Sequence, residues 1–303
     1  MTTTEPNLQQ VVPVPRSTIA PAEQVMHPRK ETGHTSWIIT TLLLICSLTV
    51  LVPLYFAITM SLKSGEQAAS GSGFSLPSPL HFDNFSTAWK LVNFPVAFGY
   101  SLFITVVAVA GQLLLSSIAA FAIARNLDHK FFRFAFVYLL AAMFIPFPVI
   151  ALPQIKLTSL VGLDNPAGVA ILHILFGLSF NVLLYSAFIR SIPPELEESA
   201  RLDGCSTWKV FWKVVFPLLA PMNATVGIFA FLASWNDYMM PALITSNPAQ
   251  QTLPVVQQLF QTQLSTNYNV AFASYLMAML PSLIGYLIAQ RWVMSGVMRG
   301  AIK

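Results

Sequence analysis

Residues 190–221 read RSIPPELEESARLDGCSTWKVFWKVVFPLLAP, and this stretch gathers charges of both signs in an otherwise largely uncharged chain. Ser191 and the two prolines that follow it predict a helix start, and the glutamates of the first turns suit the positive end of a helix dipole. Glu197 and Arg201 are spaced as an i,i+4 ion pair, and Gly204 can take the positive φ that ends a helix. We therefore predict a helix of about two turns that stops at a glycine corner.

A second short helix is predicted after this corner. Ser206 or Thr207 can cap it, and TWKVFWKVV carries an apolar stripe beside two lysines. Pro217 then opens a long apolar run. A helix, a corner and a second helix between two membrane-length segments predict a protrusion that another protein can grip. The predicted stripe consists of Trp208, Phe211, Trp212 and Val215.

The composition places the chain in a membrane. Of its 303 residues 55% are hydrophobic and 9% charged, and the mean hydropathy is +0.65, whereas soluble domains carry about 25% charged residues. The net charge of +4 comes from basic residues that flank apolar runs, so we expect a lipid bilayer and no nucleic acid as partner. The two cysteines, Cys46 and Cys205, predict neither a disulfide nor a metal site.

The apolar runs predict an all-α, polytopic protein with six spans. Three prolines near the outer end of the third span predict a bent or broken helix, and a polar insert before the last span predicts an outside loop with one short amphipathic helix. The domains expected are a flexible cytoplasmic tail, 1–36, a six-span transmembrane domain, 37–294, and a cytoplasmic C-terminal tail, 295–303. The spans are expected at 37–62, within 91–124, at roughly 134–153, at 166–189, from Pro217 to about Asp237, and at about 270–290.

The basic residues also predict the orientation. With six spans both termini lie on one side, and thirteen of the sixteen Lys and Arg residues fall on that side. The positive-inside rule therefore predicts cytoplasmic termini and a cytoplasmic charged loop. The three basic residues expected outside are Lys63, Lys90 and Lys156.

The charged loop resembles a known motif. Glu198-Ser199-Ala200, three residues, Gly204, nine residues, Val214, one residue and Phe216-Pro217 are similar to the EAA loop, E-A-A-x3-G-x9-I-x-L-P, of bacterial ABC importer permeases. Ser199, Val214 and Phe216 depart from that pattern without altering its geometry. The surrounding residues resemble the second permease subunit of carbohydrate importers, the MalG type.

This resemblance implies a fold and a set of partners. The fold would be a type I importer permease in the bacterial cell membrane, forming half of a heterodimeric pore with a MalF-type subunit. An ATPase dimer would bind the charged loop, residues 191–216, and an extracytoplasmic binding protein would deliver sugar. The chain has no phosphate-binding loop or hydrolase motif, so it would bind no cofactor itself, with ATP and Mg²⁺ held by partner subunits. The residues expected to serve ATPase coupling are Glu195, Glu198, Ala200, Arg201, Asp203, Gly204 and Pro217.

The C-terminus offers a second candidate contact. Gln290-Arg291-Trp292 and the ending SGVMRGAIK resemble the MalG-type tail, which in that family reaches the ATPase dimer. The alternative is an ordinary frayed terminus. The residues assigned to this contact are Arg299, Gly300 and Lys303.

A candidate substrate path lies near the end of the fifth span. Trp235-Asn236-Asp237-Tyr238 resembles the W-N-[DE]-[YF] signature of carbohydrate permeases, and it offers an aromatic face and hydrogen-bonding groups. Asp237 either lines this path or hydrogen-bonds to helix ends. Asn181 is a further path candidate, although it, His173 and Gln112 could equally join helices by hydrogen bonds.

The expected function is import of a di- or oligosaccharide by a non-enzymatic permease subunit. Two alternatives within the family are import of glycerol phosphate or of an amino sugar. An ion-coupled secondary transporter would ordinarily use several ionisable groups within its spans, where only Asp237 is expected. An intramembrane enzyme would need paired catalytic groups at matching depths, and no such pair is visible.

Overall fold

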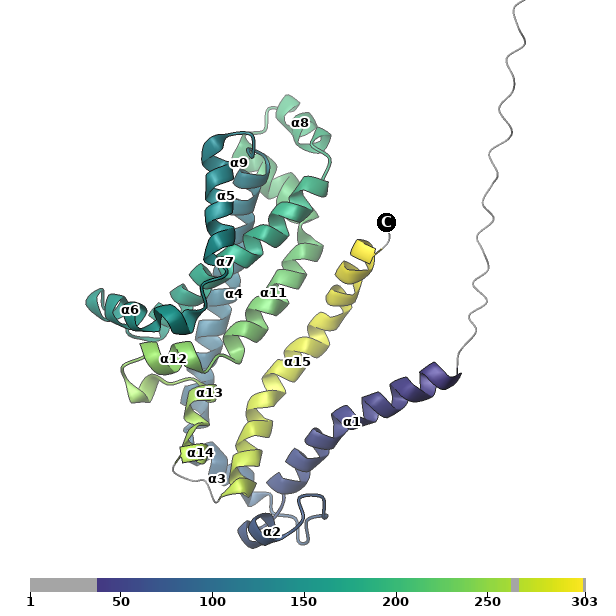
Figure 1. The fold of residues 1–303 in the computed structure, drawn as a ribbon, viewed down its shortest axis with the longest axis vertical. Coiled ribbons are helices and arrows are strands. Elements are labelled where there is room, and N and C mark those ends of the chain that lie inside the picture. The colour runs from purple at the N-terminus through teal and green to yellow at the C-terminus, as the bar shows by residue number, and fades with distance from the viewer. Residues whose placement is uncertain (1–36, 263–266, 302–303) are drawn as a thin grey trace, which may run out of the picture. The chain divides into compact units, whose positions relative to one another are not determined.

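The computed structural model describes residues 37–262 and 267–301, and within these ranges every regular element is helical (Figure 1). The chain divides into two compact units, residues 1–49 and residues 50–303. Helix α1, Trp37–Ser61, crosses the boundary between them. The predicted flexible tail, residues 1–36, lies outside the described residues.

The described residues contain four helices long and apolar enough to cross a membrane, or six spans if each of two bent helix pairs is one span. This number agrees with the six predicted spans. The first bent pair joins α5 and α6 at 104°, and the second joins residues 207–218 to α11 at 76°. The long helices are α1, α4 (Phe94–Ala124), α7 (Pro166–Ser191) and α15 (Tyr268–Ala301), whose membrane-length part is Tyr268–Leu287.

The break predicted in the third span is present, but the predicted bounds of roughly 134–153 are wrong. Helix α5, Lys130–Ala142, stops before a four-residue turn, and α6, Phe147–Leu160, continues in a different direction. Pro146 is the N-cap of α6 and Pro148 lies in its first turn. Proline lacks an N–H group, so it suits a helix start and disrupts a helix interior.

The fifth span also differs from its prediction. Pro217 lies in α10, Phe216–Leu218, and the straight helix α11, Ala220–Trp235, begins only after the 76° bend. Pro221 then occupies the first turn of α11. The apolar run is therefore continuous in sequence, while the helix axis changes direction between two prolines.

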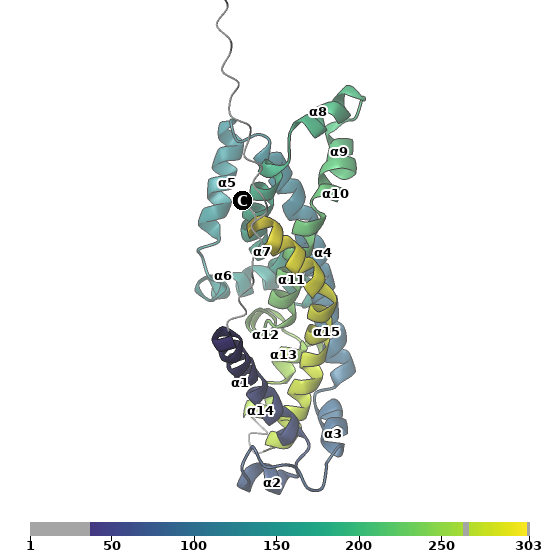
Figure 2. The same ribbon diagram turned by 90° about the vertical axis from the view of Figure 1, so that its right-hand side faces the viewer.

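Several short elements lie at one end of the second unit. Figures 1 and 2 both place α2, α3 and α14 at the end opposite to α8 and α9. The polar insert holds three short helical elements within its described part, where one helix was predicted. The bounds are α2, Gly65–Ser70; α3, Asp83–Leu91; α12, Met239–Ile244; η2, Pro248–Gln250; α13, Leu253–Val256; and α14, Leu259–Thr262.

The core of the second unit forms where α4 packs along α7, with α11 between α4 and α15. Gly177 permits the close approach of the first two helices, because a Cβ atom there would lie 2.2 Å from Oε1 of Gln112. Small residues allow this kind of contact between membrane helices. Near the α8 end, Tyr185 is fully buried and its hydroxyl donates to Oδ1 of Asn223 on α11 at 2.7 Å.

Candidate functional site

The charged loop forms the predicted helix, corner and second helix. Helix α8, Glu195–Leu202, is followed by Asp203 and Gly204; the φ of Gly204 is +81°, and the N–H of Cys205 donates back to the carbonyl of Ala200. The left-handed conformation at the corner explains the glycine. The second helix, α9, Thr207–Val210, continues directly into a π-helical turn, η1, Phe211–Val215.

The predicted pairing of Glu197 with Arg201 is wrong. Glu197 is 4% exposed and binds Arg125, which follows α4: its Oε1 accepts from Nε at 2.8 Å and lies 2.7 Å from Nη2. Nη2 of Arg125 also donates to the carbonyl of Ile192 at 3.0 Å. Glu197 points into the protein, whereas Arg201 is exposed. The buried glutamate therefore joins the charged loop to the end of α4.

Helix α8 has the reverse of the usual amphipathic arrangement. Its buried residue is Glu197, while Leu196 is 47% exposed and Leu202 is 89% exposed. Trp208, predicted as part of an apolar stripe, is also 59% exposed, although Phe211 and Val215 of that stripe are buried. Large apolar side chains thus face outward from this loop. The coupling candidates on the exposed surface are Glu195, Glu198, Arg201, Asp203, Gly204 and Pro217, whereas Ala200 is half-buried.

At the other end of α11 the structure separates the four residues of the WNDY stretch. Trp235 is buried, and its indole N–H donates to the carbonyl of Ala278 on α15 at 3.3 Å. Asn236 donates to the carbonyl of Leu232 at 2.9 Å, while Tyr238 is 44% exposed and lines a cavity of about 550 Å³. These side chains do not converge on one point.

Asp237 lies just beyond α11 and contacts two elements. Its Oδ1 accepts from the N–H groups of Met239 and Met240, at 3.0 and 3.4 Å, at the start of α12. Its Oδ2 lies 3.2 Å from Nε2 of His173 on α7, without the alignment of a hydrogen bond. The contact with helix ends considered for Asp237 is present, and the contact with His173 was not predicted.

Asn181, the other path candidate, joins two helices. It is 3% exposed, and its Nδ2 donates to Oε1 of Gln112 at 2.7 Å. Nε2 of Gln112 donates in turn to the carbonyl of His173 at 3.0 Å. This buried chain of amides is the interhelical packing that was considered for these residues. The role of Asn181 in a substrate path stays a prediction.

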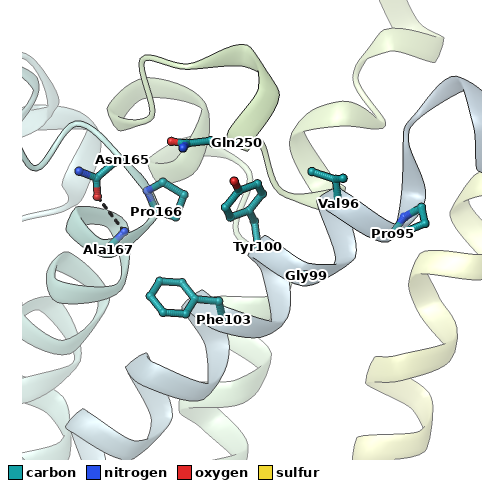
Figure 3. A pocket seen from close by; sticks show the side chains of 9 residues that line it. All are labelled: Pro95, Val96, Gly99, Tyr100, Phe103, Asn165, Pro166, Ala167 and Gln250. Carbon is teal, nitrogen blue, oxygen red and sulfur yellow. Dashed lines mark hydrogen bonds between the residues drawn. The ribbon is translucent and has the colours of Figure 1, made fainter.

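A large open cavity of about 630 Å³ lies between the first turns of α4, the start of α7 and η2 (Figure 3). Figure 3 shows the ring of Tyr100 standing between Gln250 and Phe103, and Asn165 capping α7 through the N–H of Ala167. Aromatic rings and amide groups are the groups that bind sugars, and none of the lining residues is charged. Sequence reasoning missed this cavity because its residues come from three separated segments.

The C-terminal candidates are only partly described. Arg299 and Gly300 lie in the last turns of α15, which runs unbroken to Ala301. Lys303 lies outside the described residues. Their contact with an ATPase stays a prediction.

The fold and the charged loop together define a multi-pass membrane protein with an anchored helical protrusion at one end. Within the described residues, no three His, Cys, Asp or Glu side chains are placed to bind a metal ion. Residues 112–298 match the family model of the binding-protein-dependent transport system inner membrane component. The chain belongs to this family.

Similar proteins support the carbohydrate branch of the family. The chain is 33% identical over 267 residues to the multiple sugar-binding transport system permease protein MsmG of Streptococcus mutans, covering 86% of this chain and 95% of that protein. It is 33% identical over 268 residues to the melibiose/raffinose/stachyose import permease protein MelC of Bacillus subtilis, covering 88% and 96%. A crystal structure of a bacterial ABC transporter that imports the acidic polysaccharide alginate matches with a TM-score of 0.72 and 25% identity, covering 84% and 95%.

Proposed function

We propose that this chain is half of the pore of an ATP-driven importer for a neutral di- or oligosaccharide. Its partners would be a second permease subunit, an ATPase dimer that holds ATP and Mg²⁺, and an extracytoplasmic binding protein that delivers the sugar. The family and the two sugar permeases to which the chain is similar support this proposal.

The outward face of the charged loop is the observation that carries the coupling to an ATPase. Leu196, Leu202 and Trp208 expose large apolar surfaces beside Glu195 and Glu198. Apolar patches bordered by polar residues mark protein–protein contacts, because their burial removes apolar surface from water. We infer that the ATPase subunit covers this face and that Glu198 pairs with one of its basic residues.

The inward face supports transmission of movement. A displacement of α8 acts on α4 through the pair of Glu197 and Arg125, and α4 packs along most of α7. Packed helices resist continuous deformation and move as units. We infer that movement of the docked loop tilts these helices and alternately opens the pore to each side.

The proposed orientation places the charged loop and both termini in the cytoplasm of a bacterial cell. Figures 1 and 2 support opposite sides for the charged loop and for α2 and α3. A membrane-impermeant maleimide on intact cells should label Lys90→Cys but not Lys209→Cys, in a background with Cys46→Ala and Cys205→Ala. The opposite labelling would reverse the orientation.

The function is tested with the chain co-expressed with its neighbouring transporter subunits and reconstituted in proteoliposomes. We expect ATP-dependent uptake of radiolabelled raffinose or maltotriose that requires the binding protein. Glu198→Lys should abolish uptake and the stimulation of ATP hydrolysis by loaded binding protein. The matched control Glu66→Lys makes the same charge change on α2, at the opposite end, and should leave both unchanged.

Three results would contradict the proposal. Uptake of glycerol 3-phosphate with no saccharide uptake would assign another substrate class. Uptake that persists after ATP depletion and stops when the proton gradient is dissipated would assign a secondary transporter. Normal coupling in Glu198→Lys would remove the assigned ATPase contact.

A further inference from the structure

A second cavity, here called the elbow cavity, lies inside the bend of the broken third span. Its volume is about 320 Å³, and α5, α6 and α7 all contribute to its wall. Each helix contributes residues one turn apart, which therefore share a face: Tyr138 and Ala142, Ile150 and Gln154, and Leu175 and Ser179. Three helix faces thus converge on one space.

Reckoned from the helix ends, the elbow cavity falls near the middle of the membrane. Ala142 follows Lys130, the first residue of α5, by twelve residues, and Ser179 precedes Ser191, the last residue of α7, by twelve, so each lies about 18 Å from its helix end. The hydrocarbon core is about 30 Å thick. Irregular backbone at this depth, as in residues 143–146, is tolerated where it lines a polar cavity or is buried in protein.

Three polar side chains line this cavity without a partner. The hydroxyl of Ser179, which is 6% exposed, and the amide of the half-buried Gln154 make no hydrogen bond with any residue that the structure describes, and neither does the phenol of Tyr138, which is 65% exposed. At a similar depth, Gln112 and Asn181 bind each other between α4 and α7. Polar groups in a membrane interior are costly unless something satisfies them, so the unpartnered groups indicate an external ligand or water.

The chemistry of the wall selects a class of ligand. No charged side chain lines the cavity, so nothing there compensates the charge of a phosphate or a uronic acid. The amide and the two hydroxyl groups can each donate and accept, as the hydroxyl groups of a neutral sugar require. Phe176 adds an aromatic face, which an edge-to-face contact with Phe147 holds at a centroid distance of 5.7 Å.

We infer that the elbow cavity is a binding site for one unit of a neutral saccharide inside the pore. Gln154 and Ser179 hydrogen-bond to sugar hydroxyl groups, and Phe176 contacts the apolar face of the ring. This inference rests on the proposed function and deepens it, because it assigns a substrate contact to this chain at the point where its helix is broken. The approximate volume lies at the lower end of ligand pockets, consistent with a single sugar unit.

The first test compares variants within the reconstituted transporter, using whichever of raffinose and maltotriose the wild type carries. Gln154→Leu should lower the kcat of uptake roughly tenfold, and Ser179→Ala several-fold, because each loses hydrogen bonds to the sugar. Stimulation of ATP hydrolysis by loaded binding protein should persist, so the ATP used per sugar rises. The matched control is Thr158→Val, one turn along α6, whose hydroxyl already donates to the carbonyls of Gln154 and Ile155 and should leave uptake unchanged.

A second test measures occupancy directly. In the transporter carrying Ser179→Cys, Cys46→Ala and Cys205→Ala, the saccharide should slow modification of Cys at 179 by a methanethiosulfonate reagent several-fold, while glycerol 3-phosphate should not. Normal saccharide uptake by both cavity variants, with no protection at 179, would overturn the elbow site and leave the proposed function intact. Absence of saccharide uptake by the wild type would overturn both.

Discussion

Two shielded basic side chains, Arg125 at the end of α4 and Lys63 between α1 and α3, meet their partners in different ways; the Arg125 side chain is 19% exposed. Arg125 meets the carboxylate of Glu197, a residue 72 positions away on another element. Lys63, 1% exposed, has no ion-pair partner within the described residues, and its ammonium group donates to the carbonyl of Ser72 at 2.7 Å and to Oγ of Ser75 at 3.2 Å. Those two contacts lie 9 and 12 positions away.

We call the pair of Arg125 and Glu197 the joint, because it connects two separate elements. We call Lys63 with Ser72 and Ser75 the clasp, because these residues close a single loop. The ion pair joins the charged loop to α4, and under the proposed function it would pass a movement of one element to the other. The lysine closes its own loop, and neutral amides connect that end to the rest: Asn84 donates to the carbonyls of Ser61 and Lys63, and accepts from Asn269 of α15. Under the proposed function the charged contact lies where the ATPase would act, and the opposite end is held by local closure.

The largest effect is expected when the joint loses one charge. Glu197→Ala should lower the free energy of unfolding by about 3 kcal/mol, near the lower end for a broken buried pair, because Arg125 loses its carboxylate but its side chain is 19% exposed. Denaturant unfolding of the detergent-solubilised protein measures this loss. The double variant Arg125→Leu/Glu197→Leu should be less destabilised than the single one, since an apolar pair can replace a buried ion pair. A double variant that is less stable than Glu197→Ala would show that the pair itself supplies the stability.

A smaller effect is expected at the clasp. Lys63→Met keeps the length of the side chain and removes its hydrogen bonds, so the loss should be about 1.5–3 kcal/mol. Ser75 continues to satisfy the carbonyl of Ser72, to which it already donates at 2.7 Å. Denaturant unfolding of Lys63→Met and Glu197→Ala under the same conditions compares the loss of stability at the two sites. A larger loss of stability for Lys63→Met than for Glu197→Ala would contradict the expected order of the two sites.

The corner of the charged loop should show an effect of about 1–2 kcal/mol. Gly204→Ala meets no neighbouring atom, so its cost comes only from the positive φ of +81°. Gly65→Ala is the matched control, because its added Cβ is equally unobstructed and its φ is not in that range. The free energy of unfolding and the stimulation of ATP hydrolysis should both fall in Gly204→Ala and stay unchanged in Gly65→Ala. Equal behaviour of the two variants would remove the strain argument.

The smallest change in stability is expected at the other end of α11. Asp237→Asn should alter the free energy of unfolding by under about 1 kcal/mol, because an asparagine oxygen caps α12 as well as a carboxylate does. We expect uptake to fall further than assembly, since the charge that faces His173 is lost. Rates of uptake, divided by the amount of assembled complex, measure this. An unchanged rate would leave Asp237 with its capping role alone.

Much of the fold could be predicted from the sequence, because uncharged runs indicate membrane spans and prolines indicate helix breaks. The corner at Gly204 followed from its glycine and the residues around it. The bounds of the third and fifth spans could not be predicted, since three prolines in the third span and two in the fifth permit a break at several positions. Pro146 and Pro148, rather than Pro153, coincide with the first bend.

The contacts of the site were less predictable. Glu197 has a suitable partner on its own helix in Arg201, and it prefers Arg125 because α8 turns that side inward. Apolar residues normally mark the buried face of a helix, but Leu196 and Leu202 are exposed while Glu197 is buried. Hydrophobic periodicity therefore predicts the wrong buried face for α8. The pairs Gln112–Asn181 and His173–Asp237 depend on the register between helices, which local sequence does not encode.

The docking of the charged loop is tested most directly by protection of its outer face. A cysteine at position 198 and one at position 66, each in a background with Cys46→Ala and Cys205→Ala, are treated with maleimide in the permease pair and in the full complex. Mass spectrometry should show that the ATPase subunits protect Cys at 198 and leave Cys at 66 equally reactive. Equal modification at position 198 with and without those subunits would contradict the account.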